Sequence, residues 1–218
     1  MTPSWLAAAG NRASLSLTTL PNLGDSINVA IITIATTATA GLIAATSGFI
    51  DPIGDFDPPW RRRRDVNGPC HHFTHWSIKP ISAFFFPSLA EEVFWRGILI
   101  APHPSVIIAT YATAGIFSSL MLLLRAGFVL GIHVLLHPLA GSTCWPRGRK
   151  VFCDWHFLCS ATIVLGGATL SYLVSGGSVW AAALTHGLSV ALWRDFFGGE
   201  ALLMKTKTEH DINGGEKT

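Results

Sequence analysis

Long apolar segments without charged side chains alternate with short polar segments along this chain. The first apolar segment covers residues 26–50 and contains no Asp, Glu, Lys or Arg. It is long enough to cross a hydrocarbon core of about 30 Å, which takes about 20 helical residues. Its many alanine, threonine and glycine residues suit close contact between helices in lipid. We therefore predict a first membrane helix here, preceded by a flexible N-terminus over residues 1–24.

The remaining apolar segments predict further spans, separated by residues that interrupt the apolar pattern. Arg125 separates the third span from a shorter fourth one, and Ser175-Gly176-Gly177-Ser178 divides the last uncharged run into two helices. The expected later spans are residues 78–101, 105–124, 126–140, 156–174 and 179–197. The pattern thus predicts an all-α, polytopic membrane helix bundle of about six transmembrane helices. It forms a single domain over residues 25–199, with a motif core at 78–197 and a flexible tail at 200–218.

The composition supports a multi-pass integral membrane protein. Hydrophobic residues make up 50% of the chain and charged residues 13%, about half the share of a soluble domain. A net charge of +2 gives no argument for nucleic acid. Basic residues cluster at Arg61–Arg64 and around Arg147, but alternating spans place these clusters on opposite sides, so the topology stays open unless the short fourth span is re-entrant. A bacterial inner membrane and an organelle or plastid membrane fit equally well.

The strongest chemical signal is a charged cluster inside the second apolar segment, formed by Glu91, Glu92 and Arg96. Each ionisable group costs about 2.5–3.5 kcal/mol in the middle of a membrane helix, so such groups usually mark a functional site. Glu92 and Arg96 are four residues apart and share one helix face as an ion pair. Glu91 is rotated about 100° away from that face. Without that partner, its burial is expected to bring its proton affinity toward the range of a general base. The alternative is a purely structural ion pair.

Three histidines in later apolar segments are candidate partners of these carboxylates. His133 and His137 are four residues apart on one face, and His186 lies on a separate helix. Histidines that face a carboxylate in a bundle interior can activate water, bind a divalent metal or stabilise an oxyanion. A single one would more often be a satisfied core residue. A weaker metal candidate is the segment Cys70-His71-His72 with His75, which has no second ligand pair at finger-type spacing.

Together these motifs resemble the CPBP family of intramembrane proteases, which includes CAAX prenyl endoproteases and bacteriocin-processing or Abi proteins. Glu91, Glu92 and Arg96 match its Glu-Glu-x-x-x-Arg motif. The stretch Phe94-Trp95-Arg96-Gly97-Ile98-Leu99 and the following Pro102-His103-Pro104 are similar to the cyanobacterial and plastid-like branch. For the second motif His137, followed by Pro138-Leu139, is preferred over His133. The third motif is His186, but Val190 stands where many members have Asn.

The resemblance implies an intramembrane endopeptidase that hydrolyses a peptide bond of a membrane-associated protein by Glu-activated water. Glu91 would be the base, Glu92 and Arg96 would position it, and His137 and His186 would orient water or stabilise the oxyanion. A metal, Zn²⁺ held by Glu91, His137 and His186, and a metal-free glutamate mechanism are both compatible with these residues. The expected partners are a membrane-anchored protein or peptide substrate and the lipid bilayer, without nucleic acid. Alternatives are a non-catalytic scaffold or maturation factor of the same fold, and a proton- or metal-conducting bundle.

Overall fold

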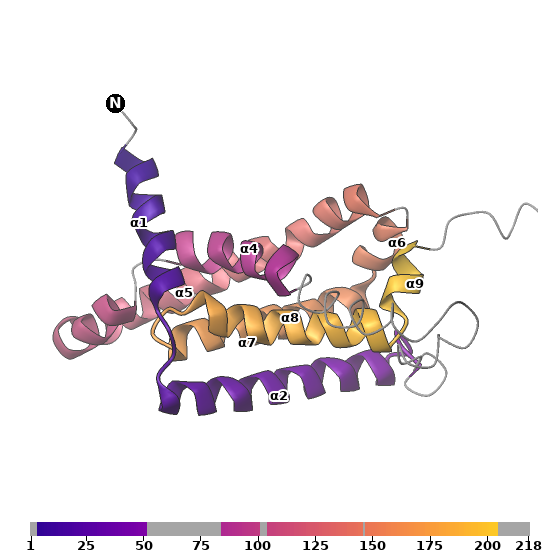
Figure 1. The fold of residues 1–218 in the computed structure, drawn as a ribbon, viewed down its shortest axis with the longest axis horizontal. Coiled ribbons are helices and arrows are strands. Elements are labelled where there is room, and N and C mark those ends of the chain that lie inside the picture. The colour runs from indigo at the N-terminus through magenta and orange to yellow at the C-terminus, as the bar shows by residue number, and fades with distance from the viewer. Residues whose placement is uncertain (1–3, 52–83, 101–103, 146, 205–218) are drawn as a thin grey trace, which may run out of the picture.

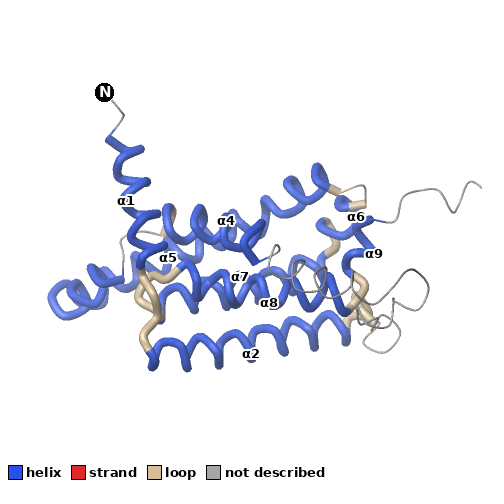
Figure 2. The backbone as a smooth tube through the Cα atoms, in the orientation of Figure 1, coloured by secondary structure: helices blue, strands red, loops and turns tan. Residues whose placement is uncertain are grey.

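The computed structural model describes residues 4–51, 84–100, 104–145 and 147–204, with 104–119 as helical backbone only. Every regular element in these residues is helical, as expected for an all-α protein (Figures 1 and 2). The elements are α1 (Ser4–Thr18), α2 (Leu23–Thr46), η1 (Phe84–Leu89), α4 (Ala90–Glu92), η2 (Val93–Ile98), α5 (Pro104–Cys144), α6 (Gly148–Phe152), α7 (Trp155–Val174), α8 (Val179–Phe196) and α9 (Gly199–Met204). We call the consecutive elements η1, α4 and η2 the motif helix.

The helices are arranged in layers, with α7 and α8 in the middle (Figure 1). Helix α2 packs along α7 and α8 on one side. On the other side the motif helix lies against α8, and α5 lies against α7. Because the middle helices contact both outer layers, residues on α7 and α8 can reach the charged side chains of the motif helix.

Close packing and hydroxyl pairs hold α2 against the middle layer. A Cβ atom added to Gly167 of α7 would overlap the side chain of Thr36 of α2, so the glycine permits the close approach. The hydroxyls of Thr33 on α2 and Thr185 on α8 lie 2.8 Å apart, and a similar pair follows one turn later. Small residues and hydroxyl contacts of this kind are typical of helix association in lipid, where the hydrophobic effect does not drive it.

The predicted break between the last two long helices is present. Helix α7 ends at Val174 and α8 begins at Val179. Between them Gly176 and Gly177 have φ values of +69° and +94°, a region that side chains with a Cβ rarely adopt. The Ser-Gly-Gly-Ser sequence therefore makes a tight turn that brings α8 back against α7.

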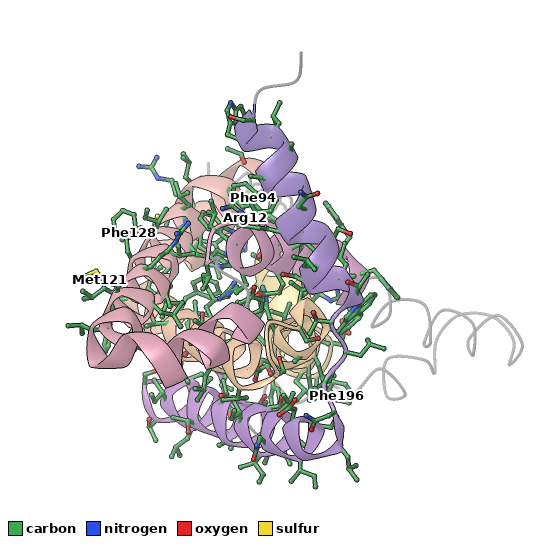
Figure 3. All side chains as sticks on the ribbon, turned by 90° about the vertical axis from the view of Figure 1, so that its left-hand side faces the viewer. Arg12, Phe94, Met121, Phe128 and Phe196 are labelled. Atoms are coloured by element: carbon green, nitrogen blue, oxygen red, sulfur yellow. The ribbon has the colours of Figure 1, made fainter. Side chains whose placement is uncertain are left out.

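The predicted break at Arg125 is wrong, because α5 continues without interruption from Pro104 to Cys144. Its 41 residues are long enough for about 60 Å of helix, more than one membrane thickness. Nε of Arg125 donates to the carbonyl of Leu99 at 2.7 Å, just after the motif helix. A single charge on an exposed helix face satisfies a helix-end carbonyl here and does not break the helix. Figure 3 shows Met121 and Phe128 of the same helix projecting away from its neighbours.

Two terminal segments are more regular than the flexible ends we expected. Residues 4–18 form α1, which lies against η2 of the motif helix. Its Ser16 is buried, and the Ser16 and Tyr172 hydroxyls are 3.3 Å apart. At the other end α9 continues to Met204. These contacts are tertiary, which is why the local composition did not reveal them.

Three of the described helices are long and apolar enough to cross a membrane by length and composition: α2, the part of α5 over Leu120–Cys144, and α7. This is fewer than the six spans we expected. The described part of the second expected span is the motif helix, and α8 matches the last expected span in position. The Arg61–Arg64 run, the Cys70–His75 cluster and His103 lie outside the described residues.

Candidate functional site

The motif helix buries an ion pair between Glu92 and Arg96, as the four-residue spacing predicted. Nη1 of Arg96 donates to Oε1 of Glu92 at 2.9 Å, and both residues are 0% exposed. The backbone that follows Glu92 is π-helical over Val93–Ile98, whereas the preceding segment Phe84–Leu89 is kinked at Phe86. Such wide turns are rare and are frequent at functional sites.

Helix α7 completes the environment of Arg96. Its Nη2 donates to the backbone carbonyl of Leu165 at 2.8 Å, and both Nε and Nη2 reach Oγ1 of Thr169, at 3.3 and 3.2 Å. Neither residue was expected at the site from the sequence. A backbone carbonyl leaves no sequence signal, and Thr169 is one of many hydroxyl residues in the apolar segments.

His133 of α5 lies between Arg96 and Glu91. Its Nδ1 is 2.9 Å from Nη1 of Arg96, and its Nε2 is 3.3 Å from Oε2 of Glu91. A guanidinium can only donate, so Nδ1 must accept and the ring proton of the neutral imidazole sits on Nε2. His133 therefore donates to Glu91. The indole of Trp95 stacks on the ring, with centroids 4.6 Å apart and planes at 17°, and holds this orientation.

His133 gives Glu91 a hydrogen-bond partner from another helix. The sequence could show only that the motif helix itself offers none. A hydrogen bond from Nε2 of His133 stabilises the carboxylate and opposes the effect of burial on it. Glu91 is still the more accessible of the two carboxylates, with its side chain 32% exposed against 0% for Glu92.

His137 and His186 carry their protons on the opposite ring nitrogen from His133. Nδ1 of His137 is 3.3 Å from the carbonyl of His133, and Nδ1 of His186 is 2.9 Å from Oε1 of Glu92. A carbonyl and an ionised carboxylate only accept, so both Nδ1 atoms donate. In the neutral form of either ring, Nε2 then keeps a lone pair, whereas the neutral ring of His133 donates through Nε2.

All five predicted site residues, and the alternative His133, are brought together from the motif helix, α5 and α8. The rings of His133 and His137 are 5.2 Å apart, and those of His133 and His186 are 6.3 Å apart. Position does not decide whether His133 or His137 is the second-motif residue, because both histidines lie close to Glu91. His133 contacts the carboxylate of Glu91 directly, whereas His137 contacts the backbone of its own helix.

Two sets of donor atoms can be compared with what zinc requires. In the described part of the chain, one ligand atom each from Glu91, His133 and His137 lies within 4.8 Å of the others, which suits a metal ion. However, Arg96 places the proton of His133 on Nε2, the atom that would have to ligate. Glu91, His137 and His186 have suitable lone pairs, but they do not form such a group. A zinc centre needs ligand atoms that lie close together and that each offer a lone pair. Neither set of residues meets both conditions, so these residues do not fit a zinc centre in this arrangement.

Val190 lies one turn after His186 on α8 and is half-buried. An apolar side chain cannot replace the amide that many members of the resembled family carry at this position.

No protein-family model, curated protein or solved structure matches this chain.

Proposed function

We propose that this chain is a multi-pass membrane endopeptidase, similar to the CPBP proteases, that hydrolyses a peptide bond of a membrane-associated protein by Glu-activated water. The observation that carries the proposal is the placement of Glu91 beside His133 and His137, next to the fully buried Glu92–Arg96 pair on the same helix. Three apolar candidate spans support the membrane location. An intramembrane site in a bundle of about six spans remains part of the proposal.

In this proposal Glu91 is the general base. Its carboxylate takes a proton from a water molecule while the water oxygen forms a bond to the substrate carbonyl carbon. The carbonyl π electrons move to its oxygen, and Nε2–H of His133 is free to donate to that oxyanion once Glu91 is protonated. Glu91 then gives the proton to the leaving nitrogen as the C–N bond breaks. His137 and His186 hold their partners through Nδ1, which leaves Nε2 of each ring available to orient the attacking water.

Glu92 and Arg96 act through the histidines in this scheme. Oε1 of Glu92 holds His186 through Nδ1, and Arg96 holds His133 through its own Nδ1. The hydrogen bond at Nδ1 decides which nitrogen of each imidazole carries the proton. The two residues are therefore positioning groups, and Glu91 is the residue that reacts.

The test is cleavage of a membrane-tethered peptide substrate by purified full-length protein in lipid nanodiscs. Glu91→Gln keeps the size of the side chain and removes the base, so we expect the rate to fall by a factor on the order of 10²–10⁴. Glu200→Gln on α9 is the matched control and is expected to keep the parental rate. Unchanged cleavage by a folded Glu91→Gln variant would remove the catalytic assignment.

A second candidate function is a non-catalytic membrane scaffold or maturation factor with the same fold. Val190 in place of a polar side chain favours it, because one group that could stabilise an oxyanion is missing. This candidate predicts no turnover of any tethered peptide library by the parental protein, together with binding of a membrane partner that survives Glu91→Gln. Turnover that depends on Glu91 would dismiss it.

A further inference from the structure

The motif helix carries a stripe of buried polar side chains that extends beyond the ion pair. Ser88, Glu92 and Arg96 follow one another at intervals of four residues, and all three are 0% exposed. Arg96 is fully surrounded by acceptors. In contrast, Oγ of Ser88 and Oε2 of Glu92 have no hydrogen-bond partner among the described residues. Two unpaired polar atoms on one face of one helix are unusual, because nearly all buried polar atoms in native proteins are paired.

The spacing of Ser88 and Glu92 indicates what links them. Residues four apart on a helix have Cβ atoms about 5–6 Å apart. The two oxygens do not bond to each other directly. Buried polar groups that have no protein partner are commonly bridged by an internal water molecule.

Helix α8 comes close to the same face because residue 187 is a glycine. A Cβ atom added to Gly187 would come 3.4 Å from Oγ of Ser88 and 3.3 Å from Cδ2 of Phe84. The hydroxyl of Ser88 therefore faces the backbone of α8 directly beside His186, whose Nδ1 bonds the other oxygen of Glu92. A side chain at position 187 would press against Phe84 and Ser88.

We propose that an internal water molecule binds between Ser88, Glu92 and Gly187 and joins Oγ of Ser88 to Oε2 of Glu92. A cation does not suit this position, because Arg96 already neutralises Glu92 and lies on the same stripe. The water satisfies both unpaired oxygens. Oε1 of Glu92 continues to accept from Arg96 and His186, so both oxygens of the carboxylate are hydrogen-bonded. This site stands whether or not the protein is a protease.

The first measurement is a structure of the full-length parental protein in nanodiscs at a resolution that shows ordered water. We expect density within hydrogen-bond distance of both Oγ of Ser88 and Oε2 of Glu92. A direct Ser88–Glu92 hydrogen bond, or no density between them in a map that shows other internal waters, would overturn the proposal. This measurement needs no variant and therefore does not depend on how well any substitution folds.

The second measurement compares the melting temperatures of Ser88→Ala and Ser178→Ala. Ser178, at the start of α8, is the matched control because it is also 0% exposed with an unpaired hydroxyl among the described residues. Deleting a truly unpaired hydroxyl is neutral or stabilising, whereas deleting one that holds a bridging water lowers the melting temperature. We expect a loss of about 2–4 °C for Ser88→Ala only. Equal behaviour of the two variants would contradict the water site.

Discussion

Arg96 donates to Nδ1 of His133 at 2.9 Å from the same Nη1 atom that donates to Glu92. One guanidinium nitrogen therefore couples a buried carboxylate on its own helix to a histidine that lies 37 residues further along the chain. Because Arg96 cannot accept, it decides where His133 carries its proton. Arg96 thus acts on Glu91 through His133, which bonds both residues.

Replacement of Arg96 is expected to destabilise the fold strongly. Arg96→Met leaves Glu92 buried without its partner, which costs about 3–5 kcal/mol. Equilibrium unfolding in mixed micelles measures the change. The exposed Arg149→Met on α6 is the control, with an expected effect within about 0.5 kcal/mol.

The double variant Arg96→Met, Glu92→Leu separates the cost of a lone charge from the worth of the pair. Buried pairs replaced by apolar residues of similar volume often lose little stability. We therefore expect the double variant to be more stable than Arg96→Met alone. A double variant less stable than Arg96→Met would show that the lone Glu92 charge does not cause the loss, and the difference between the double variant and the parental protein gives the net contribution of the pair.

The three histidines are expected to show different tautomers. Nitrogen-15 NMR of histidine-labelled protein should show the ring proton on Nε2 for His133 and on Nδ1 for His137 and His186, each assigned by a single His→Gln variant. The physical reason is the Nδ1 partner of each ring: a donor for His133, and acceptors for the other two. A proton on Nδ1 of His133 would contradict the role given to Arg96.

Zinc is expected to bind weakly to the parental protein at neutral pH. The ligand atom of His133 carries a proton that must leave before coordination, and metal affinity falls when ligands must be deprotonated. Metal analysis of protein purified without chelator should give well below one zinc per chain, and addition of EDTA should not change cleavage. Stoichiometric zinc that is lost together with activity would reverse the assignment.

The contact between α2 and α7 should be sensitive to a single methyl group. Gly167→Ala places a Cβ atom within the side chain of Thr36, so overpacking should destabilise the protein by about 1–3 kcal/mol. Gly166→Ala is the matched control, since its Cβ atom would meet only Leu130 Cδ2 at 3.8 Å. The double variant Gly167→Ala, Thr36→Ala should recover much of the loss. Equal unfolding of the Gly166 and Gly167 variants would indicate that these helices pack differently.

The sequence alone determined the helical class, the first apolar helix, the turn at Gly176-Gly177 and the Glu92–Arg96 pair. All of these depend on short-range properties, namely apolar length, glycine conformation and the four-residue spacing of a helix. The sequence also singled out every histidine of the site, because ionisable groups in apolar segments are costly wherever they occur.

Only the tertiary structure decided how these groups are connected. It brings Leu165 and Thr169 to Arg96, places His133 between Arg96 and Glu91, and shows that Arg125 ends no helix. Such contacts join residues far apart in the chain and involve backbone carbonyls and ring orientations, which leave no local pattern. The tautomer of each histidine depends on these long-range partners, so the chemistry of the site could not be read from the motifs that revealed it.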